Sequence, residues 1–338
     1  MSSTIVTGIM SYGMSGRIFH APFLDAHPGF KLKAVTERSS KTAAQRYPDI
    51  ISYNTIEELL ADEEIELIVV NTPNNTHYSL ATQALKAGKH VLIEKPAADS
   101  YAEVKELFDL GRAQNKQVLI YQNRRWDSDF LSVKQVIQSG ELGRLIEVTV
   151  RFDRYKQALS PKAFKETKGT GANGLVYDLG PHVLDQLISL FGKPVSFNKF
   201  KAANREGSEV DDYFFFQLTY PDGLNVMAAS SLLTAQPLPA FVLHGTQGTY
   251  IKDRVDVQEL QLDQNIKPTD DNYGLEEPGA EGVLTTIDAN GIKSVKAMPS
   301  VKGDYTGLFE AVYQSIVNGV PYPVTEANIL AQMELLEA

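Results

Sequence analysis

Short aliphatic and β-branched runs alternate with amphipathic segments over residues 1–120, and no other feature of the sequence constrains the fold as strongly. The runs predict strands at 4–11, 30–36, 66–71, 90–93 and 117–121. Thr55 and Glu58 have the spacing of a capping box at a helix start, and Gly88 is expected just past the end of another helix. Repeated strand and helix units of this length form a parallel sheet wrapped by helices. We therefore predict a doubly wound α/β domain.

The pattern changes after residue 120. A helix is expected at 128–139, followed by longer alternating strands within 144–155, 209–220 and 224–233, with a turn at Pro221-Asp222-Gly223. Residues 255–300 lack a clear pattern and predict loops and weak strands. A last helix at 325–338 has no stop signal, so we expect the natural chain to continue past residue 338. These features predict a second, α+β domain with a mainly antiparallel sheet. The first domain is expected to comprise residues 1–122 and the second residues 123–338, and the last helix is expected to pack back on the first domain.

Length and composition narrow the class of protein. The 338 residues suggest two domains at roughly 100 to 200 residues each. The formal net charge of −10 argues against nucleic acid or an anionic membrane as a partner. The sequence has no cysteine, which excludes disulfides, thiolate metal sites and cysteine nucleophiles. It shows neither an apolar run of about 18 residues nor a secretory signal, so a cytoplasmic protein is expected.

A glycine-bearing turn separates the first strand from the helix that follows. Gly13 would let the backbone approach a pyrophosphate, Gly16 would let the helix pack close to the sheet, and the helix start would offer free N–H donors. The dinucleotide fingerprint GxGxxG has Ser11 in place of its first glycine. The alternative is a glycine-rich turn of any α/β protein. The residues of the turn that we predict to bind cofactor are Ser11, Gly13, Met14, Ser15 and Gly16.

The end of the second strand bears on the choice of cofactor. Glu37 lies 21 residues after Gly16, near the usual spacing for an acid that binds the ribose hydroxyls of NAD. Arg38 and Ser39 follow it, then Ser40 and Lys41, and these are donors that the 2′-phosphate of NADP would need. We prefer NADP and leave NAD open. The alternative for these charges is a solvated helix start.

Two further motifs carry chemistry. Glu94-Lys95-Pro96 follows the strand at 90–93, at the edge where open α/β sheets bind ligands, although Lys95 could also be a surface lysine beside a turn. Gly180 and Pro181 predict a helix start, as N-cap and N1, that puts His182 in the first turn, where the helix dipole favours a neutral imidazole able to accept a proton. Asp178 would orient that ring. The alternatives are a capping aspartate with a core histidine, and a metal site of Asp178, His182 and Asp185.

The remaining candidates lie near strand ends. Arg125 and Trp126, in Asn123-Arg124-Arg125-Trp126, suggest contacts with a polar or anionic substrate, with a salt-bridged hinge as the alternative. Tyr155 and Lys156 are weaker substrate candidates. His77 is expected to be structural or to stand behind the residues that touch cofactor. The further residues that we predict near the cofactor are Asn71, Thr72, Pro73, Asn74, His77, Glu94, Lys95, Asn123 and Arg124.

Together these motifs resemble one family. GxxSYGMSGRxFHAP at the turn, EKP, NRRWDSDF, YDLGPHVLDQ and HGTQGTY at 244–250 are similar in order and spacing to the Gfo/Idh/MocA family of nicotinamide-dependent oxidoreductases. Within it the chain resembles the branch of NADP-dependent scyllo-inositol dehydrogenases. Ser11 departs from the usual glycine, which puts the detail of the turn in doubt more than the cofactor class.

The resemblance implies an architecture and an activity. It implies an NAD(P)-binding Rossmann domain and a substrate-binding domain whose large, mainly antiparallel sheet forms a homodimer or homotetramer. It implies hydride transfer to or from a secondary alcohol of a polyol or sugar, with Lys95, Asp178 and His182 converging on the hydroxyl and no metal. A cofactor-binding sensor or transcriptional regulator without turnover is the alternative from another class. A dihydrodiol or tetrapyrrole substrate ranks lower.

Overall fold

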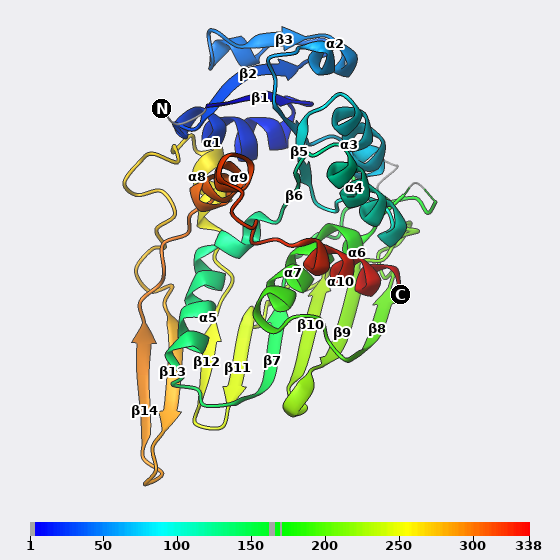
Figure 1. Ribbon diagram of the computed structural model, residues 1–338. Coiled ribbons are helices and arrows are strands. Elements are labelled where there is room, and N and C mark those ends of the chain that lie inside the picture. Colours follow the sequence, from blue (N-terminus) through cyan, green and yellow to red (C-terminus); the bar gives the residue numbers. More distant parts are fainter. Residues whose placement is uncertain (1–3, 162–165, 170) are drawn as a thin grey trace. The chain divides into compact units, whose positions relative to one another are not determined.

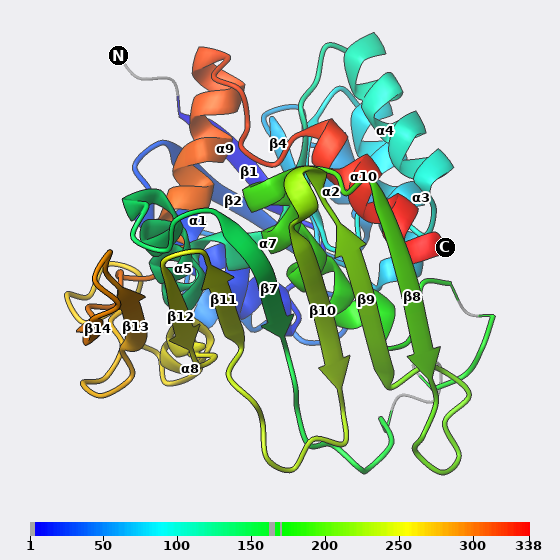
Figure 2. The same ribbon diagram turned by 90° about the horizontal axis from the view of Figure 1, so that it is seen from below.

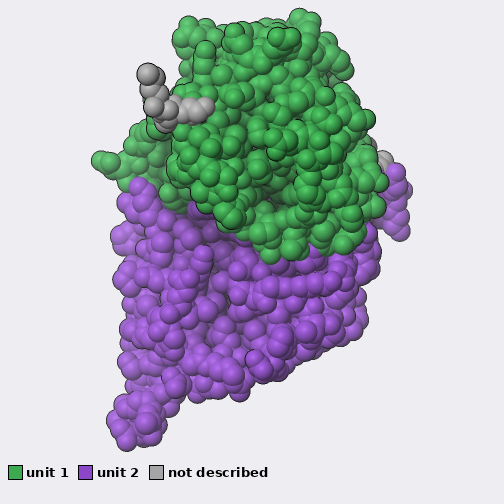
Figure 3. Space-filling model, in the orientation of Figure 1, with its two compact units in different colours: residues 1–123, 258–273, 304–330 green, residues 124–257, 274–303, 331–338 purple. Residues whose placement is uncertain are grey.

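The structure, a computed structural model, describes residues 4–161, 166–169 and 171–338. The chain divides into two units (Figure 3). Unit 1 comprises residues 1–123, 258–273 and 304–330, and unit 2 comprises residues 124–257, 274–303 and 331–338. Two late segments thus join the N-terminal residues in unit 1. The division of function between 1–122 and 123–338 stays a prediction.

Unit 1 is built on a six-stranded parallel sheet in the order β3-β2-β1-β4-β5-β6 (Figure 1). Its strands are β1 (Ile5–Ile9), β2 (Phe30–Thr36), β3 (Ile51–Tyr53), β4 (Leu67–Val70), β5 (His90–Glu94) and β6 (Val118–Tyr121). The strand order reverses between β1 and β4, which is where doubly wound sheets bind ligands beyond the carboxyl ends of their strands. The predicted α/β fold and its five strands are confirmed, whereas the three-residue edge strand β3 was not predicted.

Helices flank this sheet. They are α1 (Ala21–Ala26), α2 (Ile56–Ala61), α3 (His77–Lys86) and α4 (Tyr101–Ala113), with α8 (Val257–Asp263) and α9 (Thr306–Asn318) from the late segments. α1 contacts β2 and α9, whereas α3 contacts β4, β5 and α4. The capping box is confirmed, since Thr55 accepts from the Glu58 backbone and Glu58 from that of Thr55. Gly88 has a φ of 74°, the left-handed conformation expected after a helix end.

Unit 2 contains an eight-stranded sheet in the order β14-β13-β12-β11-β7-β10-β9-β8 (Figure 2). The strands are β7 (Leu145–Arg151), β8 (Ser196–Ala202), β9 (Tyr213–Thr219), β10 (Asn225–Ser231), β11 (Phe241–Gly245), β12 (Gly248–Lys252), β13 (Gly282–Ile287) and β14 (Lys293–Met298). Only the β7–β10 pair is parallel, so the predicted mainly antiparallel sheet is confirmed. The turn between β9 and β10 is also confirmed, with positive φ at Asp222 and Gly223.

Helices α5 (Ser128–Ser139), α6 (Leu175–Asp178) and α7 (Gly180–Phe191) contact β12, β9 and β10. Side chains alternate along the strands, so that Tyr250 and Leu284 are buried while their neighbours Ile251 and Val283 are 39% and 42% exposed. α5 and the final helix α10 (Glu326–Glu337) confirm their predictions. Of the loops and weak strands expected over 255–300, strands β13 and β14 and the loop before them are present, whereas helix α8 in the same range was not predicted. Within the described residues, no helix could cross a membrane.

Candidate active site

Asn71 holds the predicted phosphate-binding turn. It follows β4, and Ser11 follows β1, the strand beside it. The Asn71 side-chain oxygen accepts the Ser11 backbone N–H at 3.0 Å, and its amide nitrogen donates to the Ser11 carbonyl at 2.7 Å and to Ser15 Oγ at 3.2 Å. Asn71 was predicted to border the cofactor, and it also ties the turn to the sheet. The backbone N–H and carbonyl of Ser11 both bond to Asn71. The turn therefore forms with a serine side chain at the position where the fingerprint has its first glycine.

Gly16 shows why the turn needs a glycine there. A Cβ atom at Gly16 would lie 2.1 Å from the Ser11 carbonyl oxygen and 2.9 Å from Asn71 Nδ2. At Gly13 the nearest atom would be Ser11 Oγ at 3.3 Å, the end of a small side chain. A helical segment begins at the turn, and the first N–H groups of a helix lack intrahelical acceptors and attract anions. The turn therefore fits a pyrophosphate.

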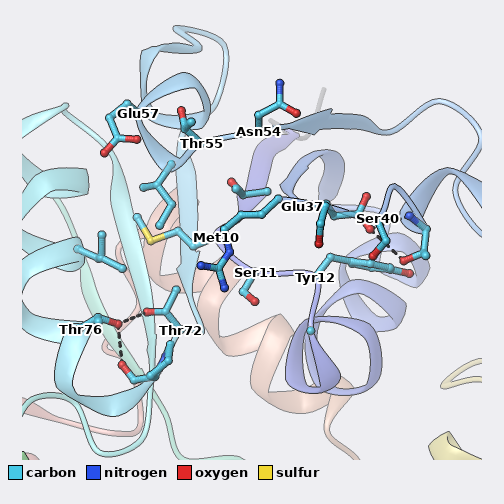
Figure 4. Close-up of a pocket in the computed structure, with 18 residues that line it drawn as sticks. Met10, Ser11, Tyr12, Glu37, Ser40, Asn54, Thr55, Glu57, Thr72 and Thr76 are labelled. Carbon is cyan, nitrogen blue, oxygen red and sulfur yellow. Dashed lines mark hydrogen bonds between the residues drawn. The ribbon is translucent and has the colours of Figure 1, made fainter. Parts of the chain in front are cut away.

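A cavity of about 630 Å³ adjoins this turn at the carboxyl ends of β1, β2 and β4 (Figure 4). Its size is within the range of small-molecule and cofactor sites, about 300–1,000 Å³. Seven predicted cofactor residues line it, namely Ser11, Gly13, Glu37, Arg38, Ser39, Thr72 and Pro73. Tyr12 and the residues Asn54–Glu57 also line it and were not predicted. Asn54–Glu57 come directly after β3. Because β3 was too short to be predicted from the sequence, the residues at its carboxyl end were not predicted to line the cavity either.

Glu37 is bonded by its own chain. Burial alone would raise the pKa of Glu37, yet hydrogen bonds from Ser52 Oγ and from Thr42 outweigh burial and lower it. Glu37 Oε1 accepts the Thr42 backbone N–H at 2.8 Å and the Thr42 hydroxyl at 2.9 Å, and the Ala43 N–H lies 3.2 Å away. Glu37 is only 8% exposed. Its carboxylate therefore closes the loop that follows β2, and the predicted contact with ribose stays a prediction.

The donors that follow Glu37 divide into two groups. Lys41 Nζ donates to the carbonyl oxygens of Glu37 and Ser52, both at 2.9 Å, and so stabilises the loop. Arg38, Ser39 and Ser40 are exposed and line the cavity. Of the predicted 2′-phosphate donors, these three face the space that a ligand would fill.

Lys95 and Glu94 lie where β5 ends. Glu94 is the last residue of the strand, and its Oε2 accepts the Lys95 backbone N–H at 3.2 Å. Glu94 Oε1 lies 2.9 Å from Nε2 of His20, a fully buried residue. The Glu94 carboxylate, predicted to contact cofactor, thus has partners within unit 1.

His77 joins two loops of the predicted site. Its Nδ1 lies 2.7 Å from the Pro96 carbonyl oxygen and its Nε2 lies 2.8 Å from the Thr72 carbonyl oxygen. Burial lowers the pKa of His77. A neutral ring carries one N–H and donates to one of these two carbonyl oxygens at a time. His77 therefore has the structural contacts expected of it. In the same loop, the hydroxyl oxygens of Thr72 and Thr76 are hydrogen-bonded at 2.7 Å. Figure 4 shows this bond.

Asp178 and His182 lie in unit 2. Asp178 is exposed and ends α6, whereas His182 is 7% exposed and lies in the first turn of α7. The prediction of Gly180 as N-cap was wrong, because α6 runs to Asp178 and leaves Leu179 as the N-cap of α7. Pro181 was predicted at the first helical position, and it takes the second, after Gly180, so it still lies in the first turn. Lys95 belongs to unit 1, so the convergence of these three residues stays a prediction.

One turn beyond His182, helix α7 fixes the segment Asn123–Trp126. Arg125 donates to both carboxylate oxygens of Asp185 at 2.7 Å, and Gln186 Nε2 donates to the Arg124 carbonyl oxygen at 2.9 Å. Burial raises the pKa of Asp185, and Arg125 opposes that rise. These partners were not predicted, although their spacing of three and four residues from His182 puts them on one face of a helix.

Arg124 and the weaker candidates have different surroundings. Arg124 donates to Asp127 at 3.1 Å and to Asp256 at 2.7 Å. Both ion pairs lie within unit 2, so the alternative of a salt-bridged hinge between domains stays untested. Tyr155 is 61% exposed, Lys156 is exposed, and Trp126 is half-buried. Among the described residues, no group of three or more His, Asp or Glu could hold a metal ion. Met14 and Asn74 belong to the turn after β1 and the loop after β4, and Asn123 is buried.

Comparison with known proteins identifies the family. Residues 5–122 match an oxidoreductase family with an NAD-binding Rossmann fold, and residues 130–251 match the GFO/IDH/MocA C-terminal domain. The chain is 34% identical over 335 residues to scyllo-inositol 2-dehydrogenase (NADP(+)) IolW of Bacillus subtilis, covering 99% of this chain and 92% of that protein. The chain belongs to the Gfo/Idh/MocA family of oxidoreductases.

Other Gfo/Idh/MocA relatives agree. An uncharacterized oxidoreductase of Schizosaccharomyces pombe, C115.03, is 37% identical over 99% of this chain and 96% of its own length. The crystal structure of an oxidoreductase from Bacillus cereus is 35% identical with a TM-score of 0.90, covering 99% of this chain and 95% of that one. The N-terminal part of the chain thus has the NAD-binding Rossmann fold of this family, and the binding of cofactor in the cavity at the turn stays a prediction.

Proposed function

We propose that this oxidoreductase transfers a hydride reversibly between nicotinamide and a secondary alcohol carbon of a polyol or sugar. The observation that carries the proposal is the full-length similarity to a scyllo-inositol 2-dehydrogenase, in a chain that has Lys95, Asp178 and His182 where the family resemblance places its catalytic residues. A hydroxylated substrate also suits the polar residues that surround the motif at 123–126.

The proposed chemistry divides between cofactor and protein. When bound, the nicotinamide supplies the hydride acceptor or donor. His182 takes the hydroxyl proton, since a position in the first turn of α7 favours the neutral imidazole. Lys95 stabilises the developing alkoxide with its ammonium group and relays the hydroxyl proton to the His182 imidazole, where the proton ends. Asp178 orients the pair, and the loop held by His77 and Asn71 fixes the cofactor turn.

Two variants test these roles. Lys95→Ala and His182→Ala should each lower kcat by about 10² to 10⁴-fold, because positioned proton transfer contributes that much to rate. The Kd for NADPH, measured by fluorescence titration, should stay within about threefold. Lys86→Ala, which changes an exposed lysine at the end of α3, is the matched control. Normal turnover by both variants would show that the roles are wrong.

Substrate class is tested by following NADPH absorbance with a panel of inositols, keto-inositols, sugars and a dihydrodiol. Sustained turnover of an inositol or sugar supports the proposal, and turnover of the dihydrodiol alone contradicts the substrate class. Tight cofactor binding without turnover of any compound would favour the sensor or regulator instead.

We further propose a preference for NADP over NAD. The support is that the Glu37 carboxylate is already bonded to Thr42, Ala43 and Ser52, whereas Arg38, Ser39 and Ser40 line the cavity. A carboxylate whose oxygens already accept these hydrogen bonds has less capacity to accept from the ribose hydroxyls, the contact that favours NAD. Titration of the protein with NADPH and NADH tests the preference, and equal Kd values would contradict it.

The open face of the unit 2 sheet supports a homodimer or homotetramer. Val242, Ile251 and Val283 are neighbours across β11, β12 and β13 on the face opposite buried Leu243, Tyr250 and Leu284. Such an apolar row suits a second copy of the same chain. Sedimentation equilibrium measures the oligomeric state. The cytoplasmic location is part of the same proposal, and cell fractionation tests it.

A further inference from the structure

His20 is a buried polar residue that the proposed chemistry leaves without a role. It ends the π-helical turn Gly16–His20, which continues the phosphate-binding turn. Its ring is fully buried, and its centroid lies 4.4 Å from that of Tyr121 and 6.3 Å from that of Phe309. A histidine in such surroundings is costly unless its ring nitrogens find partners. Nδ1 has none among the described residues, so the contact made by Nε2 with Glu94 is the polar bond that accounts for a histidine here.

That contact is with a carboxylate at the end of β5. Nε2 lies 2.9 Å from Glu94 Oε1, and because a carboxylate only accepts, Nε2 carries the proton. Burial alone would raise the pKa of Glu94, but the hydrogen bond from His20 and the nearby charge of Lys95 hold that pKa below its ordinary value. Glu94 is therefore an anion, and its second oxygen accepts the backbone N–H of Lys95.

These bonds form a continuous path through unit 1. The path runs from the glycine turn through residues 16–20 to the His20 ring, then through the Glu94 carboxylate to the backbone of Lys95. Each end of this path is a part of the predicted site: the turn is a place for pyrophosphate and Lys95 is a group that acts on substrate. Glu94 was predicted to contact cofactor, and its bonds to His20 and to Lys95 give it a different role.

We propose that His20 and Glu94 are positioning residues that fix Lys95 relative to the phosphate-binding turn. The inference rests on the proposed function only in that Lys95 acts on substrate. Loss of Glu94 removes the bond to the Lys95 N–H, and loss of His20 removes the bond that orients the Glu94 carboxylate, while the turn, held separately by Asn71, stays in place. Turnover should fall while cofactor affinity is kept, which is the opposite of what damage to the turn would cause.

Three variants measure this effect. His20→Phe keeps a ring beside Tyr121 but has no donor, and Glu94→Gln keeps the shape of the side chain without its charge. Each should lower kcat on the best compound of the substrate panel by about 10- to 100-fold, since small misplacements of a reacting group have such effects. KM and the Kd for NADPH should change by less than about threefold. His20→Gln restores a donor and should recover part of kcat.

A second measurement needs no substrate. Trinitrobenzenesulfonate labels lysine amines, and peptide mass spectrometry gives the labelling rate of Lys95 and of exposed Lys86 separately. In His20→Phe and Glu94→Gln, the rate at Lys95 should change by more than about threefold while the rate at Lys86 stays constant, because Glu94 holds the backbone that positions the Lys95 amine, whereas Lys86 lies at the end of α3.

His27→Gln is the matched control. It removes another histidine–glutamate contact of unit 1, the 2.8 Å pair of His27 with exposed Glu310, and should leave both kcat and the Lys95 labelling rate unchanged. If Glu94→Gln folds and shows wild-type labelling at Lys95, the positioning role is wrong whatever the substrate. If labelling changes while no panel compound is turned over, the positioning role holds and the proposed function fails.

Discussion

At the scale of single residues, the two glycines of the turn should differ in what an added methyl group does. In Gly16→Ala the Cβ would meet the Ser11 carbonyl oxygen at 2.1 Å, so the turn must shift and the free energy of unfolding should fall by about 1–3 kcal/mol. In Gly13→Ala the nearest atom is Ser11 Oγ at 3.3 Å, and the change should stay within about 0.5 kcal/mol. Urea unfolding of the cofactor-free protein measures both. Equal losses would contradict the close approach at Gly16.

The types of residue in this candidate site were easier to predict from the sequence than the hydrogen-bond and ion-pair partners of each residue. The sequence predicted Gly16 and the capping box of Thr55 with Glu58, because each depends on neighbours a few residues away. It did not predict that Glu37 would be bonded by Ser52, 15 residues later, since spacing does not tell which way a carboxylate points. Arg125 with Asp185, 60 residues apart, is a similar case.

At the scale of elements, the start of β5 should make stability depend on pH. His90 Nδ1 accepts the Gln117 backbone N–H at 2.9 Å, and burial together with nearby Lys116 lowers the pKa of His90 to about 4 from 6.5. Between these pH values His90 is protonated in the unfolded chain and neutral in the folded chain. The free energy of unfolding therefore falls as the pH falls from 6.5 to about 4.

His90→Gln tests this dependence. Glutamine keeps an acceptor for the Gln117 N–H and does not titrate. The slope of unfolding free energy against pH should become shallower between 6.5 and about 4, as measured by urea unfolding at several pH values. Above the histidine range, the variant and the wild type should be similar in stability. An unchanged slope in the acid range would count against a neutral His90.

Elements were predicted where their pattern was long. The helix expected at 128–139 agrees with α5, and alternation or continuous apolar runs predicted five strands of the first sheet and β7, β9 and β10 of the second. Strands β8, β11 and β12 were not predicted. Strand β3 has three residues, too few for a period, and α8 lies in a range rich in turn residues. The N-cap of α7 was misplaced because α6 is a single turn that ends just before it.

At the scale of the whole molecule, the two sheet orders follow from general rules of chain connection, whereas the affiliation of residues 258–273 and 304–330 with unit 1 does not. Those segments come after most of the second sheet, and their contacts are with residues far away in sequence, as where Phe309 stacks 5.1 Å from Phe23. A hydrophobic pattern identifies a helix and the face it buries, but it does not identify the sheet that receives it.

The net charge of −10 opposes the approach of an anionic cofactor over the whole molecule, so a local cation must offset it. Arg38 is exposed and lines the cavity, and charges attract one another over about a Debye length, about 8 Å at physiological salt. In the wild type, added NaCl should weaken NADPH binding, because it screens the attraction of Arg38 for the 2′-phosphate. In Arg38→Ala only the overall repulsion remains, so NADPH should bind more weakly at low salt, and added salt should leave its Kd unchanged or lower it.

NADH, which lacks the 2′-phosphate, is the matched control, and its salt dependence should be similar in both proteins. Fluorescence titrations over a salt series give the four curves. A wild-type NADPH curve that is parallel to the NADH curve would contradict the role of Arg38.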